Sequence, residues 1–300
     1  LSPELVWAPL SPLDNTELAA LIARAEAVDD PPYRTTEQET AEYFVDPTYS
    51  GVAGRDGEGV MRAFGLVRIR PAGEVYASMS GVVDPQWRHR GIGGALLHWQ
   101  THVVTTVLEE DERMQEHMRD LGFSARRWYR EVRRSLADAV PEVDIDGFLT
   151  IEPWSQDYDD AARRVHNQSL AGGFGSFTMS REDWNAGRTY FVPQWSFIAV
   201  DRSGDRARVA GYLRSARYEQ DWEALGWREG YTDVLGVLSD YRHRQIGPAL
   251  LVAAMRAYAA DGMEYAAAGV DTDNPSGAVD LYESLGYVPT RGTILYALDV

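Results

Sequence analysis

The sequence predicts a mixed α/β fold built from two tandem modules of similar design. The main observation is a repeat: Val82-Val-Asp-Pro-Gln-Trp-Arg-His-Arg-Gly-Ile-Gly-Gly-Ala-Leu-Leu97 closely matches Val237-Leu-Ser-Asp-Tyr-Arg-His-Arg-Gln-Ile-Gly-Pro-Ala-Leu-Leu251. In both copies an apolar strand runs into an arginine-rich and glycine-rich turn, and apolar residues at helical spacing follow directly. The 300 residues, 44% of them hydrophobic, are also enough for two ordinary cores. We therefore expect modules at residues 1–140 and 146–300.

Each module is expected to open with a strand and an amphipathic helix. Apolar residues bounded by a proline form the strand signal, and apolar residues three and four positions apart form the helix signal. A capping residue followed by carboxylates then marks the start of a short helix. We expect these elements at 5–10, at 15–27 and from Thr35 in the first module, and at 148–154, at 158–170 and from Ser180 in the second.

A β-meander is predicted next in each module, because glycine-containing turns separate short apolar segments. The strands are expected at 52–53, 60–69, 197–200 and 209–217. The second module carries about eight extra residues before its turn, at Glu219–Trp227. Loops of this kind usually carry specificity. The two tryptophans and three carboxylates of this loop would suit a pocket for an amine with apolar character, but its aromatic side chains would equally suit the cover of a sheet edge.

The repeated turn of each module is suited to bind phosphate. Backbone N–H groups of such a turn, continued by the free N–H groups of the first helical residues, present partial positive charge. Glycine lets the backbone approach the ligand without a side chain in the way. A dinucleotide-binding fingerprint would also begin this way, but Leu96 stands where its third glycine belongs. In the second copy Gln245 replaces the first glycine, and phosphate can still bind there if the glutamine side chain turns outward.

The segments after the two turns differ. Helices are expected at 93–104 and 247–261, and a buried strand is expected at 264–271 in the second module. The first module is ten residues shorter here, so we expect the corresponding strand to be missing. Two arginine pairs at 126–127 and 133–134 are interpreted as a solvated strand face that ends the first module. The acidic, proline-containing stretch 138–147 is the expected linker.

Two stretches carry a family resemblance. The turn Arg88-x-x-Gly91-x-Gly93 and the closing stretch Asn274-Pro-Ser-Gly-Ala-Val-Asp-Leu-Tyr-Glu-Ser-Leu-Gly-Tyr287 resemble the GNAT superfamily of acetyl-CoA-dependent N-acetyltransferases. The resemblance implies two tandem GNAT-like modules and acetyl-CoA as co-substrate, with its pyrophosphate on the turn. The residues implied to contact acetyl-CoA are Val82, Val83, Arg88, Arg90, Gly91, Ile92, Gly93, Gly94 and Ala95 in the first module. In the second module they are Leu235, Gly236, Val237, Arg242, Arg244, Gln245, Ile246, Gly247, Pro248, Ala249 and Asn274.

The resemblance also implies catalytic roles in the second module. Tyr282 would donate a proton to the departing thiolate, since a phenol with a pKa near that of a thiol can act as such an acid. It lies eight residues after Asn274, so both face the same side of a helix. A backbone N–H near 235–237, beside a β-bulge, would contact the acetyl carbonyl oxygen as it gains charge.

The base in this family is often an acidic residue earlier on the same strand. Alternation puts Glu229, Tyr231 and Asp233 on one face of that strand, so Glu229 and Asp233 are our candidates and Tyr231 is a lesser one. In the first module Met118 takes the place of Tyr282, Glu110 takes that of the asparagine, and apolar residues take those of the bases. The first module is therefore expected to be non-catalytic.

Composition narrows the chemistry further. The chain has no cysteine, which excludes disulfides, thiol nucleophiles and an acetyl-cysteine intermediate. The net charge of −17 disfavours nucleic acid as a partner and is compatible with a cationic amine. No apolar run is long enough to span a membrane, no signal pattern opens the chain, and no histidine spacing indicates a metal site. We expect a soluble cytoplasmic protein without metal or membrane partner.

These observations predict direct transfer of an acetyl group from acetyl-CoA to a primary amine of a small molecule, in a ternary complex at the second module. Some two-module members of the family acetylate the cysteinyl amine of a thiol precursor, which is a second possible acceptor. Two other functions stay open. A non-enzymatic acyl-CoA-binding protein would follow if Gln245 disables the second turn. An aminoacyl-transferring peptidoglycan enzyme with paired GNAT-like modules would share the fold, but is expected to lack the phosphate turn.

Overall fold

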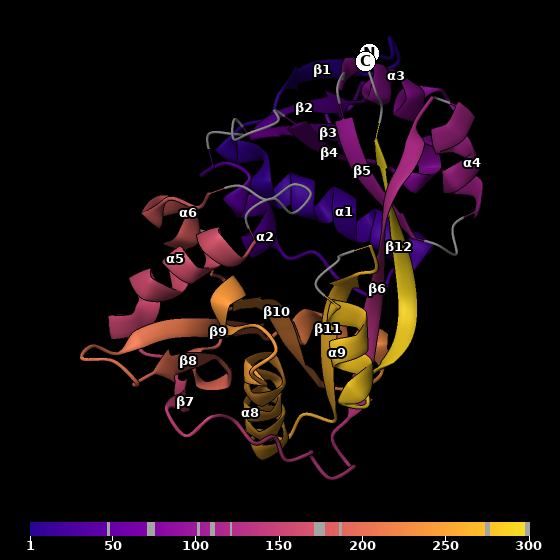
Figure 1. The fold of residues 1–300 in the computed structure, drawn as a ribbon. Helices are drawn as coiled ribbons and strands as arrows, with labels where there is room; N and C mark the ends of the chain where they lie inside the picture. Colours follow the sequence, from indigo (N-terminus) through magenta and orange to yellow (C-terminus); the bar gives the residue numbers. More distant parts are fainter. Residues whose placement is uncertain are drawn as a thin grey trace. The chain divides into compact units, whose positions relative to one another are not determined.

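The strands and helices of the computed structural model follow the mixed α/β pattern that the sequence predicts (Figure 1). The structure describes residues 1–46, 49–70, 76–100, 103–108, 112–120, 122–170, 178–185, 188–273 and 277–297. The chain divides into two compact units, Leu1–Arg126 with Glu223–Leu225 and Ile294–Val300, and Arg127–Trp222 with Gly226–Thr293. Each unit carries a sheet and one copy of the repeated turn.

The first unit is a meander followed by a parallel strand. Its sheet has the order β1-β2-β3-β4-β5, in which only the β4–β5 pair is parallel. Thr36 caps α2, because its hydroxyl accepts a hydrogen bond from the backbone N–H of Glu39 while the Glu39 carboxylate accepts one from Thr36. The elements are β1 (Val6–Pro9), α1 (Asn15–Asp29), α2 (Glu37–Glu42), β2 (Tyr49–Arg55), β3 (Met61–Arg70), β4 (Tyr76–Val83), α3 (Ile92–Trp99), β5 (Val103–Leu108) and α4 (Glu112–Asp120).

The second unit repeats this order with additions. Its sheet has the order β6-β11-β10-β9-β8-β7, and only the β10–β11 pair is parallel. The elements are β6 (Ser124–Ser135), β7 (Leu149–Pro153), α5 (Asp159–Ser169), α6 (Arg181–Asn185), β8 (Phe197–Asp201), β9 (Arg208–Ala216), β10 (Glu229–Val237), α8 (Ile246–Ala260), β11 (Tyr265–Asp271) and α9 (Ala278–Ser284). The short helix α7 (Trp222–Leu225) precedes β10 in the chain, and its residues Glu223–Leu225 are grouped with the first unit. The last strand of the chain is β12 (Val288–Ala297).

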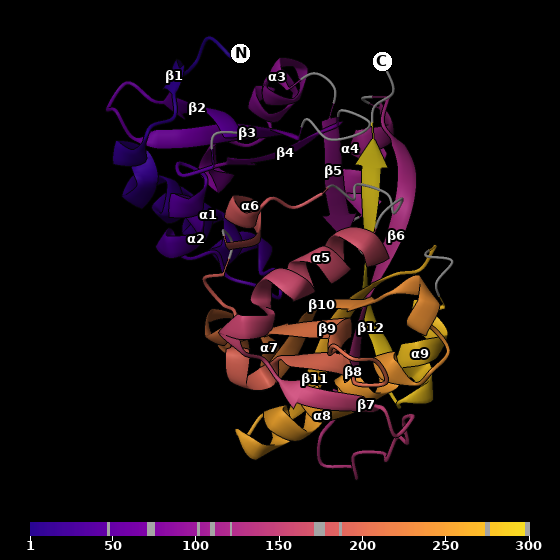
Figure 2. The ribbon, with the colours of Figure 1, turned by 60° about the vertical axis from the view of Figure 1, so that its left-hand side comes forward.

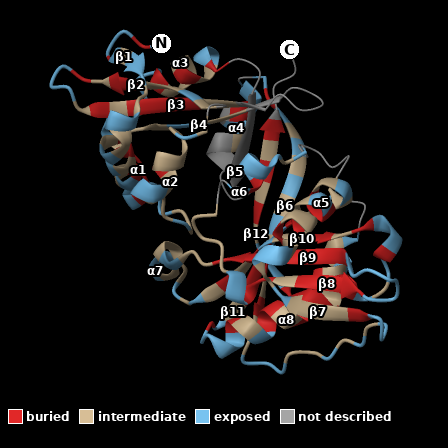
Figure 3. Cartoon of the chain, turned by 90° about the vertical axis from the view of Figure 1, so that its left-hand side faces the viewer, coloured by how far each residue is buried: buried red, intermediate tan, exposed pale blue. Residues whose placement is uncertain are grey.

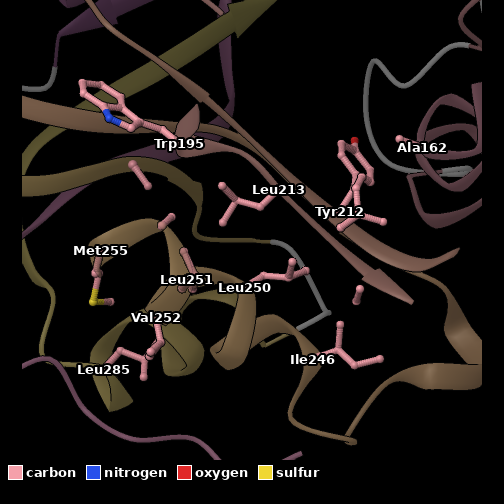
Figure 4. Close-up of a cluster of buried hydrophobic side chains, with 14 of the residues drawn as sticks. Ala162, Trp195, Tyr212, Leu213, Ile246, Leu250, Leu251, Val252, Met255 and Leu285 are labelled. Carbon is pink, nitrogen blue, oxygen red and sulfur yellow. The ribbon is translucent and has the colours of Figure 1, made fainter. Parts of the chain in front are cut away.

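Helices α5 and α8 cover opposite faces of the second sheet (Figure 2). Successive residues of β9 show why: Leu213 lies on the side of α8 with Leu250 and Leu251, and Tyr212 lies on the side of Ala162 of α5 (Figure 4). Both faces of β9 are therefore buried, as are most residues of β8 (Figure 3). Burial on both faces explains why these strands are almost continuously apolar.

Two expectations for the first module are wrong. The helix after its turn ends at Trp99 instead of near residue 104, and the strand expected to be missing is present as β5. The run Val103-Val-Thr-Thr-Val-Leu108 is rich in β-branched residues, which favour strands over helices. The first module is therefore shorter than the second in the segments on either side of β5, and β5 itself is kept.

The interpretation of the arginine pair 133–134 as a solvated strand face is also wrong. Arg134 is buried, and its guanidinium donates hydrogen bonds to the backbone carbonyls of Leu285, Ala139 and Ser135 at 2.7, 2.7 and 3.0 Å. Arg133 lies over the rings of Trp227 and Tyr265, at 3.9 and 4.4 Å from the ring centroids. Both arginines are structural parts of the second unit, because β6 pairs along its length with β11.

Within the described ranges, no helix is long and apolar enough to cross a membrane. The same residues contain no group of three or more histidine, aspartate or glutamate side chains arranged to hold a metal ion.

Candidate active site

A β-bulge opens the sheet between β10 and β11. The register of β10 against β9 shifts between Thr232 and Val234, so Asp233 is the extra residue of the bulge. The parallel pairing of β10 with β11 covers Glu229–Thr232 and ends at the bulge. Beyond it, the edge of β10 that carries residues 235–237 is free of β11 in the described chain. A free strand edge of this kind presents backbone N–H groups that a ligand can use.

The bulge also changes which residues face which helix. Before it, Gly230 and Thr232 face α8, since a Cβ at Gly230 would lie 2.3 Å from the Tyr258 ring and the Thr232 hydroxyl lies 3.2 Å from that of Tyr258. After it, Gly236 faces α5, where a Cβ would lie 2.7 Å from the Ser169 hydroxyl. One inserted residue thus reverses the alternation of the strand.

Glu229 is held on the face of the sheet opposite α8. The indole Nε1 of Trp227 donates a 2.8 Å hydrogen bond to its carboxylate. Burial raises the pKa of Glu229, while the hydrogen bond from Trp227 and the positive charge of Arg133 oppose that rise. Trp227, from the inserted loop, therefore both covers Arg133 and anchors a candidate base. Trp227 thus provides aromatic cover, and the use of this loop as a pocket lining stays a prediction.

Asp233 is the candidate base whose carboxylate is least engaged with other described residues. The residue is exposed, and within the described chain its carboxylate has neither a hydrogen bond nor an ion pair. Enough protein surrounds the carboxylate to raise its pKa, an effect that the positive charge of Arg214 opposes. A carboxylate that is accessible but poorly solvated is a stronger base than one in water.

A residue absent from the sequence prediction, Glu131 of β6, meets Tyr231 across β11. The Tyr231 hydroxyl donates to the Glu131 carboxylate at 3.1 and 3.2 Å from its two oxygens. Gly269 lies on the strand between them and leaves room for the two side chains to meet, since a Cβ there would lie 3.0 Å from the Tyr231 hydroxyl. Burial raises the pKa of both Glu131 and Tyr231. No local signal marks Glu131, because its partner is 100 positions away.

Tyr282 lies on α9 and is buried, with its ring packed edge-on against that of Tyr287 at 5.1 Å. Burial raises the pKa of Tyr282 well above the usual value, so the phenol stays protonated at neutral pH. The next residue toward the N-terminus, Leu281, approaches the second turn, since a Cβ at Gly247 would lie 3.3 Å from it. Helix α9 and the turn are therefore neighbours. Asn274 lies outside the described residues.

The second turn has the same backbone path as the first despite Gln245. Gln245 is left-handed at φ +62°, and Gly91 occupies the equivalent position at φ +75°. His243 and His89 match as well, at φ +61° and +63°. The Gln245 side chain is exposed and so turned outward. Helical hydrogen bonding in α8 starts with the Ala249 N–H, which leaves the preceding helical amides without an acceptor inside the helix.

Other implied coenzyme contacts surround this turn. Arg244 donates to Asp146 at 2.9 Å and stacks on Tyr241, whose hydroxyl donates to the buried Asp201 at 2.7 Å. Arg242 is exposed, with only a 3.5 Å contact to the carbonyl of Ser169. Pro248 lacks an N–H, so one amide of the first helical turn is missing as a donor. Ile246 and Ala249 are buried against the core.

The first turn is preserved, but its leading arginine is already occupied. Arg88 makes a two-pronged ion pair with Asp29 at 2.6 and 2.7 Å. Arg90 stacks on Trp87 at 4.4 Å, while a Cβ at Gly94 would meet no atom within 4 Å and one at Gly93 would lie 4.0 Å from Val83. At the position of Tyr282, the side chain of Met118 is buried with Phe123 and two other apolar residues. The first unit thus has a turn and no counterpart of the phenol.

Comparisons with known proteins agree with the geometry. Residues 193–289 match the acetyltransferase (GNAT) domain family. A mycothiol acetyltransferase of Gordonia bronchialis is 28% identical over 265 residues, which are 80% of this chain and 78% of that protein. One from Rhodococcus opacus is 26% identical over 94% of this chain and 93% of that protein.

Solved structures show the same fold over the full length. The crystal structure of a GCN5-related N-acetyltransferase from Sphaerobacter thermophilus covers 99% of this chain and 96% of its own, with a TM-score of 0.71 at 18% identity. A tandem GNAT protein from the clavulanic acid biosynthesis pathway covers 98% of both chains, with a TM-score of 0.70 at 17% identity. The family match over residues 193–289 and the mycothiol acetyltransferase relatives indicate an N-acetyltransferase, and the fold over the length of the chain is that of tandem GNAT proteins.

Proposed function

We propose that the second unit transfers the acetyl group of acetyl-CoA directly to a primary amine of a small molecule. The observation that carries the proposal is the bulge at Asp233, which leaves a free backbone edge at 235–237 beside an accessible, poorly solvated carboxylate. Acyl transfer to an amine needs a hydrogen-bond donor for the carbonyl oxygen and a base for the amine, and both must lie beside the thioester. The bulge offers a candidate for each: backbone N–H groups at 235–237 as donors and the Asp233 carboxylate as base.

The steps of the transfer assign one role to each group. The turn at 242–249 holds the pyrophosphate, and backbone N–H groups near Leu235–Val237 hold the thioester carbonyl. The amine forms the new N–C bond, the C–S bond breaks, and the amine proton passes to Asp233 or Glu229. The departing thiolate takes a proton from Tyr282, which is protonated at neutral pH. Its raised pKa makes it a weaker acid than an ordinary tyrosine, against the match to a thiol pKa that the resemblance implies. The sequence contains no cysteine, so an acetyl-cysteine intermediate is excluded.

The coenzyme site is tested by a matched pair of turn variants. Gly247→Glu and Gly93→Glu each place a carboxylate in one of the two turns, where it repels phosphate. We expect calorimetric titration with acetyl-CoA to lose binding with Gly247→Glu and to keep it with Gly93→Glu. Urea unfolding of both variants checks that the fold is kept, since a Cβ at Gly247 would lie 3.3 Å from Leu281. Loss with Gly93→Glu alone would move the coenzyme to the first unit and contradict the proposal.

The acid is tested by Tyr282→Phe. Removal of the hydroxyl is expected to lower kcat by about 10²-fold or more, with the affinity for acetyl-CoA unchanged, because general acid catalysis typically contributes that much. Thiol release measures the rate and calorimetry measures the affinity. A variant with full kcat would remove Tyr282 from the mechanism.

The names of the relatives support a second candidate for the acceptor. The 28% identity to a mycothiol acetyltransferase extends over most of both chains. In this candidate the acceptor is the cysteinyl amine of the mycothiol precursor. Thiol release with that precursor, compared with simple primary amines at equal concentration, separates the two candidates: a kcat/KM higher by 10²-fold or more for the precursor would select it.

A further inference from the structure

Arg214 of β9 is a buried arginine whose guanidinium has no hydrogen bond or ion pair among the described residues. It is 6% exposed, and its Nε is buried without a hydrogen-bond acceptor. In the part of the chain that the structure describes, its guanidinium takes part in no hydrogen bond and in no ion pair within 4.0 Å. Burial of a cation without a partner costs several kcal/mol in general. Packing alone does not explain why an arginine occupies this position.

The neighbouring Arg188 packs on the same two aromatic rings and provides a comparison. Both guanidinium groups stack on the rings of Trp184 and Phe191, Arg214 at 4.8 and 5.1 Å and Arg188 at 5.7 and 5.4 Å. Arg188, however, also makes an ion pair with Asp159, in which its Nη2 donates to both carboxylate oxygens at 2.8 and 2.9 Å. Arg214 has the same aromatic support, but no described carboxylate lies within ion-pair distance of it.

Arg214 is next to the bulge. In the sheet it lies opposite Val234, the residue after Asp233. Its positive charge acts on Asp233 without forming an ion pair, and it acts on the buried His166, whose pKa burial and this charge lower to about 4. At neutral pH His166 is therefore uncharged, and Arg214 is the arginine beside the bulge whose charge no ion pair among the described residues neutralises.

We propose that Arg214 binds a carboxylate of the acceptor, and that the acceptor is an amino acid whose α-amine receives the acetyl group. This inference rests on the proposed function. The guanidinium fork matches a carboxylate with two parallel hydrogen bonds, a geometry for which arginine is particularly suited. Asp233, one residue from the partner position of Arg214, accepts the ammonium proton. Because Arg214 and Asp233 occupy neighbouring positions in the sheet, an acceptor that contacts both has its amine and its carboxylate close together.

Matched acceptors test the proposal. L-leucine and L-alanine are compared with their amides, which keep the amine and lose the carboxylate, in a thiol-release assay with acetyl-CoA. The amine of an amino-acid amide loses its proton more readily than that of the amino acid, so the two acceptors differ in more than the carboxylate. We therefore divide kcat/KM for the amino acid by kcat/KM for its amide, and compare this acid-to-amide ratio between wild type and variants. Arg214→Met removes the charge and keeps the apolar stem, whereas Arg214→Lys keeps the charge and loses the fork. We expect a ratio above about 10 for the wild type, near 1 for Arg214→Met and between these for Arg214→Lys, as the loss of one charge-assisted pair predicts.

A binding measurement that needs no turnover accompanies the assay. Calorimetric titration of the protein and coenzyme A with N-acetyl-L-leucine, the expected product, should show binding that Arg214→Met weakens at least 10-fold. Urea unfolding should show that Arg214→Met does not destabilise the free protein, because it removes an unpaired buried charge. Marked destabilisation would assign Arg214 to the fold and overturn the proposal.

The remaining outcomes separate this inference from the proposed function. If alkylamines without a carboxylate, such as 1-aminopentane, are acetylated as efficiently as the amino acids, the acetyl transfer stands and the carboxylate site is overturned. The same conclusion follows if the acid-to-amide ratio is equal in wild type and Arg214→Met. If acetyl-CoA binds but no amino acid, amide or alkylamine releases thiol, both the inference and the proposed acceptor class fail.

Discussion

Single residues show where this protein tolerates unfavourable local conformations or environments. Gln245 adopts a left-handed backbone that costs an L-residue roughly 1 kcal/mol, and its partner in the repeat is glycine. His166 is buried and uncharged, with its Nδ1 2.6 Å from the Tyr212 hydroxyl. Both residues border the candidate site. Their costs are measurable by single substitutions.

Gln245→Gly is expected to stabilise the protein by at most about 1 kcal/mol. Glycine removes the left-handed strain, and its greater freedom in the unfolded chain offsets part of that gain. Because the turn already has the glycine-like path, the affinity for acetyl-CoA should stay within about twofold. Urea unfolding and calorimetry check the two statements. The reverse change in the first turn, Gly91→Gln, is the control and should destabilise by a similar amount; equal stability of all three proteins would contradict the strain argument.

His166 is expected to make the protein less stable in mild acid. Its pKa of about 4 in the fold lies below its ordinary value near 6.5, so the unfolded chain binds the proton first as the pH falls. Stability is therefore full above pH 6.5 and is lost progressively between about 6.5 and 4, by about 2 to 3 kcal/mol. His166→Gln should flatten this part of the profile, measured by urea unfolding at pH 8 and pH 5. Substitution of the exposed His98 by glutamine should leave the profile as in wild type.

At the scale of elements, the bulge in β10 organises the candidate site. A single extra residue ends the pairing with β11 and exchanges the faces of the strand, so that Asp233 and the free edge at 235–237 lie together. A second arrangement crosses three strands, where Tyr231 reaches Glu131 over Gly269. Glycine is required there by the close approach of the two side chains.

Gly269→Ala tests that arrangement. The added methyl group would lie 3.0 Å from the Tyr231 hydroxyl and 3.2 Å from a Glu131 oxygen, so the pair must separate. Overpacking of this kind costs about 1 to 3 kcal/mol, which urea unfolding would measure. Gly204→Ala is the control, because its Cβ would meet no atom within 4 Å. If Gly269→Ala proves as stable as the control, the contact of Tyr231 with Glu131 is not constrained by this glycine.

At the scale of the whole molecule, the repeat is not a simple duplication of two closed modules. Strand β6 pairs with β11 over Tyr265–Asp271, and Arg134 of β6 bonds the carbonyl of Leu285 at 2.7 Å. The sheet of the second unit therefore includes residues that precede the expected linker. The boundary at 140–146 remains a prediction, which chain truncation can test.

Two fragments should differ in stability. We predict that residues 127–300 unfold cooperatively in urea, whereas residues 146–300 lose cooperative unfolding, because the latter leave β11 with an unpaired edge and remove Arg134. Circular dichroism through a urea titration measures the difference. Identical transitions for the two fragments would show that β6 is dispensable and would favour the boundary at 146.

The sequence by itself determined much about this protein: the α/β class, the two repeated turns and the acetyltransferase resemblance, all of which depend on local spacing of glycine, arginine and apolar residues. It also pointed to the strand of Asp233. Only the tertiary structure decided that Asp233 is the extra residue of a bulge, that Glu131 meets Tyr231, and that Arg214 is buried with no ion pair to another described residue. The physical reason is that a sheet brings together residues from strands far apart in the chain, and no local pattern encodes which strand lies next to which.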